Sequence, residues 1–339
     1  MLRPFLHAFA AVFALTGCAV LGLVFSADRG SVPVHPGPFP LAAEAALPAS
    51  SSVPFLLPVP LAPPPVSVEE TPLPEPRRDV PWPEGVRLSA PPVRAYNGMR
   101  AEFPFPPTTT PVVVPVLMYH HIRPLTSKLT AQEKRYSVDP QVFRAQILSL
   151  LDAGFTPVRL ADFEAAVRAD DPSRLPAKPV LLTFDDGFRD HYEEVFPLLQ
   201  EARIPATFFV LSQGFESIYL TKPMLREMAA SPYVAIAAHT RRHADLTRLS
   251  AAARQEQIKG SKDDLEALLG VPVDAFAYPY GSANDAVRRD VEAAGYQLGF
   301  GIRLGSFHGS ASRWQLRRIP VTNGWDMTPI LERFLLPRS

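Results

Sequence analysis

The sequence Val-Leu-Leu-Thr-Phe-Asp-Asp-Gly at residues 180–187 decides the fold and the place of the functional site. A short apolar run that ends in two carboxylates and a glycine is typical of a buried strand in a parallel sheet. Ligands in such folds bind at the carboxyl ends of the strands. We therefore expect Asp185 and Asp186 to lie at a site, with Gly187 allowing a sharp turn before a helix that begins near Phe188.

The two adjacent carboxylates need a compensating partner, because neighbouring carboxylates resist joint ionisation. A metal ion on one of them would leave the other free to act as a base. A second apolar run, at residues 233–238, is followed by His239 and His243. Residues at this spacing share one face of a helical turn, so both imidazoles could reach an ion that is held by a carboxylate.

Each motif taken alone has a simpler explanation. An isolated Asp-Asp-Gly is more often a turn, and an isolated His-x-x-x-His is more often a solvated helix face. Here both motifs follow strand-like runs in one region of the chain, and this combination favours a metal site.

The region from residue 112 onward alternates strand-like and helix-like segments. Strands are predicted at 112–119, 180–184, 206–211, 233–238, 275–278, 297–300 and 318–321. Helices are predicted at 139–151, 161–169, 188–202, 221–229, 250–269 and 283–294. This alternation predicts an α/β fold with a parallel sheet, either open or closed into a barrel.

The motifs in their order resemble those of a known family. Thr-Phe-Asp-Asp-Gly, His-Thr-x-x-His and Ala-Tyr-Pro-Tyr-Gly at 277–281 resemble the polysaccharide deacetylase family, carbohydrate esterase family 4. The sequence Pro-Val-Leu-Met-Tyr-His-His-Ile at 115–122 is similar to the branch that contains bacterial poly-N-acetylglucosamine deacetylases. The resemblance covers about residues 112–335, and it implies a distorted, incomplete (β/α) barrel for a catalytic domain at 112–339.

The resemblance also implies a role for each motif residue. Asp185 falls on the general base and Asp186 on a metal ligand, with His239 and His243 completing the ligand set. Tyr280 falls on the residue whose backbone N–H binds the developing oxyanion. The implied cofactor is one divalent metal ion; zinc is favoured, and cobalt, nickel and iron are alternatives.

Two positions depart from the family pattern. Members often carry an arginine two residues before the proline of the third motif, where it steadies the base. This chain has Ala277 there, and Arg317 or Arg318 is the candidate replacement. Many members also have a late Leu-x-His that supplies the general acid, but none occurs after residue 281. The resembled branch uses a histidine of its first strand, which makes His120 the candidate acid and His121 the fallback; for His120 the alternative is a structural role in orienting a loop.

The resemblance implies hydrolytic removal of N-acetyl groups from an N-acetylglucosamine-containing polysaccharide of the cell envelope. Poly-β-1,6-N-acetylglucosamine is the favoured substrate, while peptidoglycan or a chitin-like chain stays open. Three alternatives remain. The same site could serve a polysaccharide O-acetyl esterase, the scaffold could be a non-catalytic glycan-binding protein, or the proline-rich stretch of a tethered structural protein could be the functional part.

The amino-terminal segment predicts export. Residues 5–26 are almost wholly apolar and follow Arg3, which suits a membrane anchor or a secretory signal at residues 1–30. Cys18 ends a Leu-Thr-Gly-Cys sequence that resembles a lipoprotein processing box, and lipid attachment there is the alternative to an uncleaved anchor. Each possibility places the catalytic domain in the cell envelope, either periplasmic or extracellular. With Cys18 as the only cysteine, no intrachain disulfide can form.

Composition separates a linker from the catalytic domain. The chain has 39 prolines, and 23 of them lie between residues 31 and 115, so we expect a largely disordered tether at 31–111. Lysine plus arginine and aspartate plus glutamate both total 34, giving a net charge of zero. No basic face suggests nucleic acid as a partner. The expected partners are an acetylated polysaccharide and the membrane, with a monomeric catalytic domain.

Overall fold

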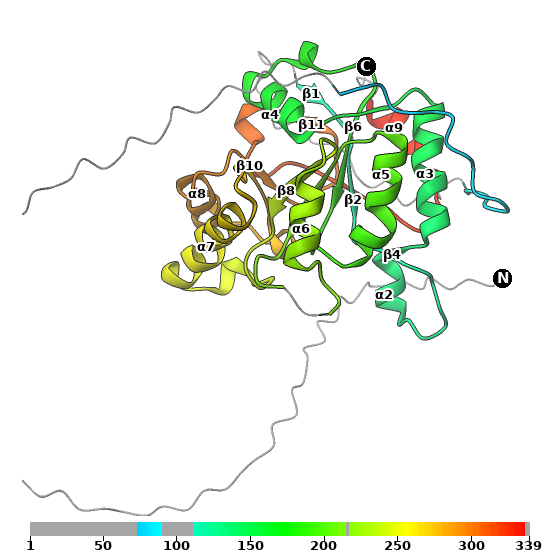
Figure 1. Ribbon diagram of the computed structural model, residues 1–339. Helices are drawn as coiled ribbons and strands as arrows, with labels where there is room; N and C mark the ends of the chain where they lie inside the picture. Colours follow the sequence, from blue (N-terminus) through cyan, green and yellow to red (C-terminus); the bar gives the residue numbers. More distant parts are fainter. Residues whose placement is uncertain (1–72, 90–110, 215–216, 336–339) are drawn as a thin grey trace, which may run out of the picture. The chain divides into compact units, whose positions relative to one another are not determined.

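The computed structural model describes residues 73–89, 111–214 and 217–335 (Figure 1). The predicted export segment 1–30, including Cys18, and most of the predicted linker lie outside these residues. Within the described ranges, no helix has both the length and the apolar character needed to cross a membrane.

An eight-stranded parallel sheet forms the centre of the described domain. Seven strands follow the order β10-β9-β8-β7-β6-β2-β12, and β5 pairs with β6 beside this path. The bounds are β2 Val116–Tyr119, β5 Thr156–Pro157, β6 Pro179–Phe184, β7 Ala206–Val210, β8 Val234–Ala238, β9 Ala275–Ala277, β10 Leu298–Phe300 and β12 Ile319–Pro320. The predicted alternation of strands and helices is therefore confirmed.

The two outer strands of the sheet approach each other through a short irregular segment. Gly301 donates a backbone hydrogen bond to Leu316, and Leu316 donates one to Gly299, so the segment before β12 runs along β10. Phe300 and Leu316 form an isolated parallel bridge. The sheet thus curls into the distorted, incomplete barrel that the sequence resemblance implied.

Helices cover the outer face of the curled sheet, as Figure 1 shows for α3, α5, α6 and α7. Their bounds are α2 Ala131–Arg135, α3 Pro140–Asp152, α4 Leu160–Ala169, α5 Phe196–Ala202, α6 Lys222–Ala229, α7 Ala251–Leu269, α8 Asp285–Ala293 and α9 Thr328–Leu335. Asp139 and Ser250 cap α3 and α7 through their side chains, as expected from the sequence. The short α2 and α9 were not predicted.

Side-chain alternation along β6 determines the direction of the Asp185 side chain. Val180, Leu182 and Phe184 belong to the large apolar cluster shared with the helices. Leu181 belongs to the smaller cluster on the opposite face of the sheet. Because side chains alternate with a period of two, Thr183 and Asp185 share the face of Leu181. Asp185 therefore points into the barrel interior.

Two predicted elements differ from the structure. The strand at 112–119 is split into β1 Val112–Val113 and β2, because Pro115 cannot donate to a ladder. The helix predicted from Phe188 begins later and opens with a π-helical turn, His191–Val195, before α5. Pro197 has no backbone N–H to donate at the start of α5. The π-helical turn, in which the Phe196 N–H donates to the His191 carbonyl, accommodates this missing donor.

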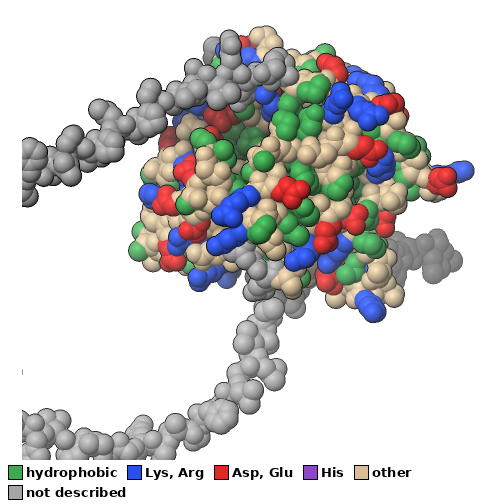
Figure 2. All heavy atoms as spheres, in the orientation of Figure 1, with side chains coloured by type: hydrophobic (Ala, Val, Ile, Leu, Met, Phe, Trp, Pro, Cys, Tyr) green, Lys and Arg blue, Asp and Glu red, His purple; other side chains and the backbone are tan. Residues whose placement is uncertain are grey.

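Residues 73–89, which fall inside the proline-rich stretch, pack on the domain. Arg77 N–H donates to the Ala202 carbonyl at 2.8 Å, and Val80 is buried in the large apolar cluster. Ser89 N–H donates to the Gly324 carbonyl, also at 2.8 Å. This part of the stretch is therefore held against α5 and the carboxyl-terminal region. On the face shown in Figure 2, basic and acidic side chains are interspersed.

Two short pairs of strands lie outside the central sheet, one near each end of the barrel. β1 pairs antiparallel with β11 Phe307–His308, and β3 His121–Ile122 pairs with β4 Ser137–Val138 at the other end.

The buried His308 ring donates from Nε2 to the Val114 carbonyl at 2.9 Å, and its Nδ1 has no partner among the described residues. Burial lowers the pKa of His308 to about 4.

His308 predicts a pH dependence of stability. Between pH 6.5 and 4 the unfolded chain binds a proton that the folded chain excludes, so the free energy of unfolding falls as the pH falls. His308→Gln keeps an N–H donor near the Nε2 position but does not titrate. We expect the loss of stability from pH 7 to pH 4.5, measured by denaturant unfolding, to be smaller by about 2 kcal/mol in the variant. Equal losses in the two proteins would contradict this account.

Candidate active site

The predicted site residues gather at the carboxyl ends of the central strands. Asp185 N–H donates to the Tyr119 carbonyl at 3.0 Å, and His239 N–H donates to the Val210 carbonyl at 2.9 Å. These bonds extend the sheet ladder by one residue beyond β6 and β8. The paired acids and the paired imidazoles are therefore held by the sheet at the same end of the barrel, as the sequence predicted.

Three side chains form a compact set of metal-ligand atoms. Asp186 Oδ1 lies 3.4 Å from His239 Nε2 and 3.3 Å from His243 Nε2. All three ligand atoms lie within 4.8 Å of one another. Asp186 Oδ1 is buried and accepts no hydrogen bond from the described residues. An unpaired buried carboxylate oxygen is costly, and a cation would satisfy it, so these residues fit a divalent metal ion.

The surroundings prepare this set for a cation. His239 Nδ1 donates to the Ala277 carbonyl at 2.8 Å, which fixes the ring with its Nε2 directed at Asp186. Burial alone would raise the pKa of Asp186, but attraction to His239, with smaller contributions from His120 and His243, holds that pKa well below its usual range. Asp186 is therefore ionised at neutral pH, as a metal ligand must be.

Left-handed backbone conformations bring the site together. Of the six non-glycine residues with positive φ in the described chain, four lie here: Asp186 at 75°, Thr240 at 70°, His243 at 56° and Tyr280 at 59°. Such conformations cost free energy and cluster at functional sites. The prediction that a helical turn aligns the two histidines was wrong. A non-helical turn aligns them, and the His243 N–H stabilises this turn by donating a hydrogen bond to Thr240 Oγ1 at 2.9 Å.

The other carboxylate of the pair has a separate partner. Arg318 Nη1 lies 2.6 Å from Asp185 Oδ1, and Nη2 lies 2.7 Å from Oδ2, a bidentate pair. Asp185 is 2% exposed and Arg318 is fully buried. Burial would raise the pKa of Asp185, but the Arg318 charge brings it below the usual value. Asp185 is thus an ionised carboxylate in a fixed orientation.

Arg318 is itself anchored, and this settles a choice that the sequence left open. Its Nε donates to the Gly301 carbonyl at 2.8 Å, and its guanidinium lies 5.4 Å from the centre of the Phe209 ring. Arg317 instead donates from Nη1 to the Leu304 carbonyl. Of the two candidate arginines, Arg318 occupies the supporting position beside Asp185.

The two histidines after β2 have different surroundings. His120 is half-buried, and its ring lies 5.0 Å from that of Tyr136. Burial lowers the pKa of His120, while Asp185 and Asp186 act in the opposite direction, which places it in the field of both carboxylates. His121 Nδ1 lies 2.7 Å from Asp190 Oδ2. His120, and not His121, therefore remains the candidate acid.

Tyr280 lies beside the metal-ligand set. It belongs to a 3₁₀ turn, Pro279–Gly281, and its ring contacts that of His243 at 4.6 Å between centroids. The side chain is 62% exposed. The hydrogen bonds found among the described residues do not use the Tyr280 N–H. A free backbone donor beside the ligand set agrees with the predicted oxyanion contact, which stays a prediction.

Sequence reasoning missed one buried histidine. His191 Nε2 donates to the His120 carbonyl at 2.6 Å from the π-helical turn. The ring is fully buried, and its Nδ1 has no partner in the described chain. No local sequence signal marks this contact, because it joins residues 71 positions apart through an irregular turn.

Comparisons with known proteins agree with this geometry. The family model described as polysaccharide deacetylase matches residues 173–299. The poly-β-1,6-N-acetyl-D-glucosamine N-deacetylase of Staphylococcus epidermidis is 29% identical over 243 residues, covering 64% of this chain and 81% of the relative.

Solved structures show the same fold. The deacetylase PplD of Streptococcus pyogenes, solved in complex with acetate, is 30% identical with a TM-score of 0.61, covering 67% of this chain and 100% of that chain. IcaB from Ammonifex degensii is 25% identical with a TM-score of 0.57, covering 66% and 97%. The chain therefore belongs to the polysaccharide deacetylase family.

Proposed function

We propose that this chain hydrolyses N-acetyl groups of an N-acetylglucosamine-containing polysaccharide of the cell envelope. Poly-β-1,6-N-acetylglucosamine is the favoured polymer, because the Staphylococcus epidermidis relative carries that activity in its name. The observation that carries the proposal is that the two adjacent acids have different partners. Asp186 faces two imidazoles, while Asp185 is held by Arg318. Peptidoglycan and chitin-like chains are the alternative substrates.

Asp186, His239 and His243 would hold one divalent ion, with zinc favoured. When bound, the ion acts as a Lewis acid and lowers the pKa of water toward neutrality. Carboxylate and imidazole donors also suit cobalt, nickel and iron. Metal analysis of the purified protein decides among these ions, and protein that is active without any metal would contradict the proposal.

The residues of the chain then carry the proton transfers. Asp185, ionised and oriented by Arg318, takes a proton from water as the water oxygen adds to the amide carbonyl carbon. The Tyr280 N–H donates to the oxyanion that develops there. His120 gives a proton to the nitrogen as the carbon–nitrogen bond breaks. Acetate leaves, and the sugar retains an amine.

The same site could remove O-acetyl groups, so the products distinguish the two activities. Incubation with N-acetylglucosamine oligomers should release acetate and free amines in equal amounts. Acetate released from O-acetylated polysaccharide without any free amine would favour the esterase alternative. A non-catalytic glycan-binding role would give neither product, and the retained Asp185–Arg318 pair argues against it.

Asparagine at each of the two adjacent acids gives a matched test. Asp186→Asn should weaken zinc binding by about 100-fold or more, because an amide oxygen is a poorer ligand than a carboxylate. Asp185→Asn should keep one zinc per chain and lower kcat by about 100-fold or more, because the base is lost. Zinc retention in Asp185→Asn also reports that this variant folds. Near-normal kcat in Asp185→Asn would rule out its role as the base.

Two substrates with different leaving groups distinguish the roles of His120 and His121. His120→Ala should lower the rate on N-acetylglucosamine oligomers by about 100-fold. The rate on 4-nitrophenyl acetate should fall much less, because nitrophenolate leaves without a proton. His121→Ala is the control, and it should change both rates by the same factor. Equal losses on both substrates in His120→Ala would contradict its assignment as the acid.

We also propose that residues 5–26 tether the chain in the membrane, with the catalytic domain outside the cytoplasm. The apolar length of this segment supports the proposal. Cys18→Ser should stay in the membrane fraction, whereas deletion of 5–26 should release the chain. Recovery of Cys18→Ser in the soluble fraction would contradict an uncleaved anchor and favour lipid attachment at Cys18.

A further inference from the structure

A bidentate ion pair joins the turn between His239 and His243 to helix α7. Arg241 lies in this turn, and Asp264 lies on the helix. Arg241 Nε donates to Asp264 Oδ2 at 2.8 Å, and Nη2 donates to Oδ1 at 2.9 Å. Arg241 Nη1 also lies 3.6 Å from Glu256 Oε1 on the same helix. A bidentate pair fixes the relative geometry of its two partners, so the turn is held against α7.

Asp264 also holds the loop that follows β7. Ser212 Oγ donates to Asp264 Oδ2 at 2.9 Å, and Gln213 Nε2 donates to the same oxygen at 3.4 Å. The backbones of the two loops are joined as well, because the Ser212 N–H donates to the Thr240 carbonyl at 3.2 Å and the Gln213 N–H donates to the Arg241 carbonyl at 3.1 Å. One carboxylate of α7 therefore connects the loops after β7 and β8.

The residue before His243 is held in a similar way. The Arg242 N–H donates to Oε1 of Gln257, a buried residue of α7, at 3.1 Å. Arg242 Nε donates to Gln213 Oε1 at 2.9 Å. Each of the three residues between the two histidines is thus hydrogen-bonded to α7 or to the loop after β7.

Gly260 gives the Arg241 guanidinium the space that it needs to reach Asp264. A Cβ added to Gly260 would lie 2.5 Å from Arg241 Cζ and 2.6 Å from Nε. A side chain at this position would therefore displace the guanidinium. Gly260 lies inside α7, where glycine is less favourable than alanine. The helix thus has an unfavourable residue at the place where the arginine crosses it.

The turn depends on such contacts because its backbone is strained. Thr240 and His243 have positive φ, and Thr240 is β-branched, a residue type for which this conformation is rare. Such conformations persist only where the surrounding structure holds them. The His239 ring has its own hydrogen bond to the Ala277 carbonyl. The position of His243 is set by the turn, through its N–H to Thr240 Oγ1.

We propose that Arg241 and Asp264 are positioning residues for the metal site. Their ion pair holds the turn in the conformation that places His243 Nε2 beside Asp186. Without the pair, only a fraction of the molecules would have His243 in place, and the apparent metal affinity would fall in proportion to that fraction. The inference rests on the metal site of the proposed function, and it assigns a role to two residues outside the ligand set.

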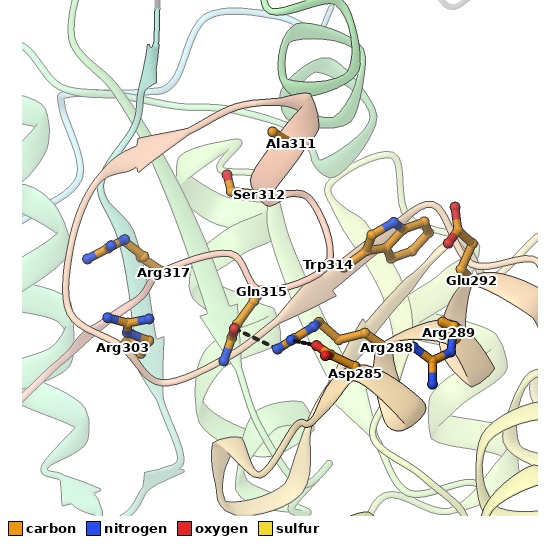
Figure 3. Close-up of a pocket in the computed structure, with 10 residues that line it drawn as sticks. All are labelled: Asp285, Arg288, Arg289, Glu292, Arg303, Ala311, Ser312, Trp314, Gln315 and Arg317. Atoms are coloured by element: carbon orange, nitrogen blue, oxygen red, sulfur yellow. Dashed lines mark hydrogen bonds and ion pairs between the residues drawn. The ribbon is translucent and has the colours of Figure 1, made fainter. Parts of the chain in front are cut away.

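Two other arginines join separate elements at a distance from the metal ligands, and they provide matched controls. Arg144 of α3 makes a bidentate pair with Glu201 of α5, at 3.0 and 2.9 Å. The side chains of this pair are 24% and 40% exposed, against 21% and 30% for Arg241 and Asp264. Arg288 of α8 donates from Nη1 to Gln315 Oε1 at 2.9 Å. Figure 3 shows this contact beside a cavity that none of the proposed metal ligands lines.

The test is a zinc titration of the full-length protein in competition with a fluorescent chelator. Arg241→Gln and Asp264→Asn should each weaken zinc binding by about tenfold, the lower end of what supporting residues of metal sites contribute. The double variant should bind zinc as each single variant does, because both substitutions remove the same pair. Gly260→Ala should also weaken zinc binding by about tenfold, although alanine is the better helix former.

The controls separate metal positioning from general stability. Arg144→Gln and Arg288→Gln should bind zinc within about twofold of the wild type, even where denaturant unfolding shows that they destabilise the metal-free protein as much as Arg241→Gln does. Equal zinc affinity in Arg241→Gln and the controls would overturn the inference. An equal loss of zinc affinity in all three arginine variants would also overturn it, because that result reports general destabilisation.

The titration can fail independently of the proposed activity. Wild-type protein that binds zinc and deacetylates N-acetylglucosamine oligomers, with unchanged zinc affinity in Arg241→Gln, would refute the positioning role alone. Weaker zinc binding in Arg241→Gln, together with no acetate released from any oligomer by the wild type, would refute the proposed activity and leave the positioning role in place. Wild-type protein that binds no divalent ion would refute both.

Discussion

The repulsion between two adjacent carboxylates at the end of β6 is the constraint on which the site depends. Asp185 and Asp186 can both be ionised only because they face different partners. Side-chain alternation directs Asp185 into the barrel, where it meets Arg318. A left-handed backbone at Asp186 directs the second carboxylate toward His239 and His243. The backbone geometry therefore gives the two adjacent carboxylates different partners.

The incomplete barrel supplies these partners from distant parts of the chain. Arg318 comes from the segment that bridges the open side between β10 and β12, where the Gly301 carbonyl holds it. Removing one member of a buried ion pair typically costs about 3–5 kcal/mol. If Asp185 acts as the base, as we propose, its firm hold by Arg318 is expected to couple fold stability to activity. The irregular segment that bridges the barrel would then be part of the active site.

Much of the architecture could be predicted from the sequence, because its signals are local. Apolar runs marked the strands, and Asp139 and Ser250 marked the starts of helices. The parallel sheet followed from the alternation, but the incomplete barrel required the family resemblance. The packing of residues 73–89 was missed, because proline-rich composition does not reveal which short segments bury a side chain such as Val80.

The sequence predicted which site residues converge, but not how they do so. The choice between Arg317 and Arg318 depends on which of two neighbouring side chains enters the barrel, and this is set by long-range register. The turn between His239 and His243 depends on positive φ at Thr240, a residue with no marked preference for it. The His191 contact to the His120 carbonyl arises from a π-helical turn, which periodicity cannot reveal.

Anomalous X-ray diffraction from zinc-soaked crystals would test the separation of the two carboxylates most directly. The account predicts one zinc peak, ligated by Asp186 Oδ1, His239 Nε2 and His243 Nε2, with Asp185 still paired to Arg318. A zinc ion ligated by Asp185, or a peak outside the reach of Asp186, would contradict it.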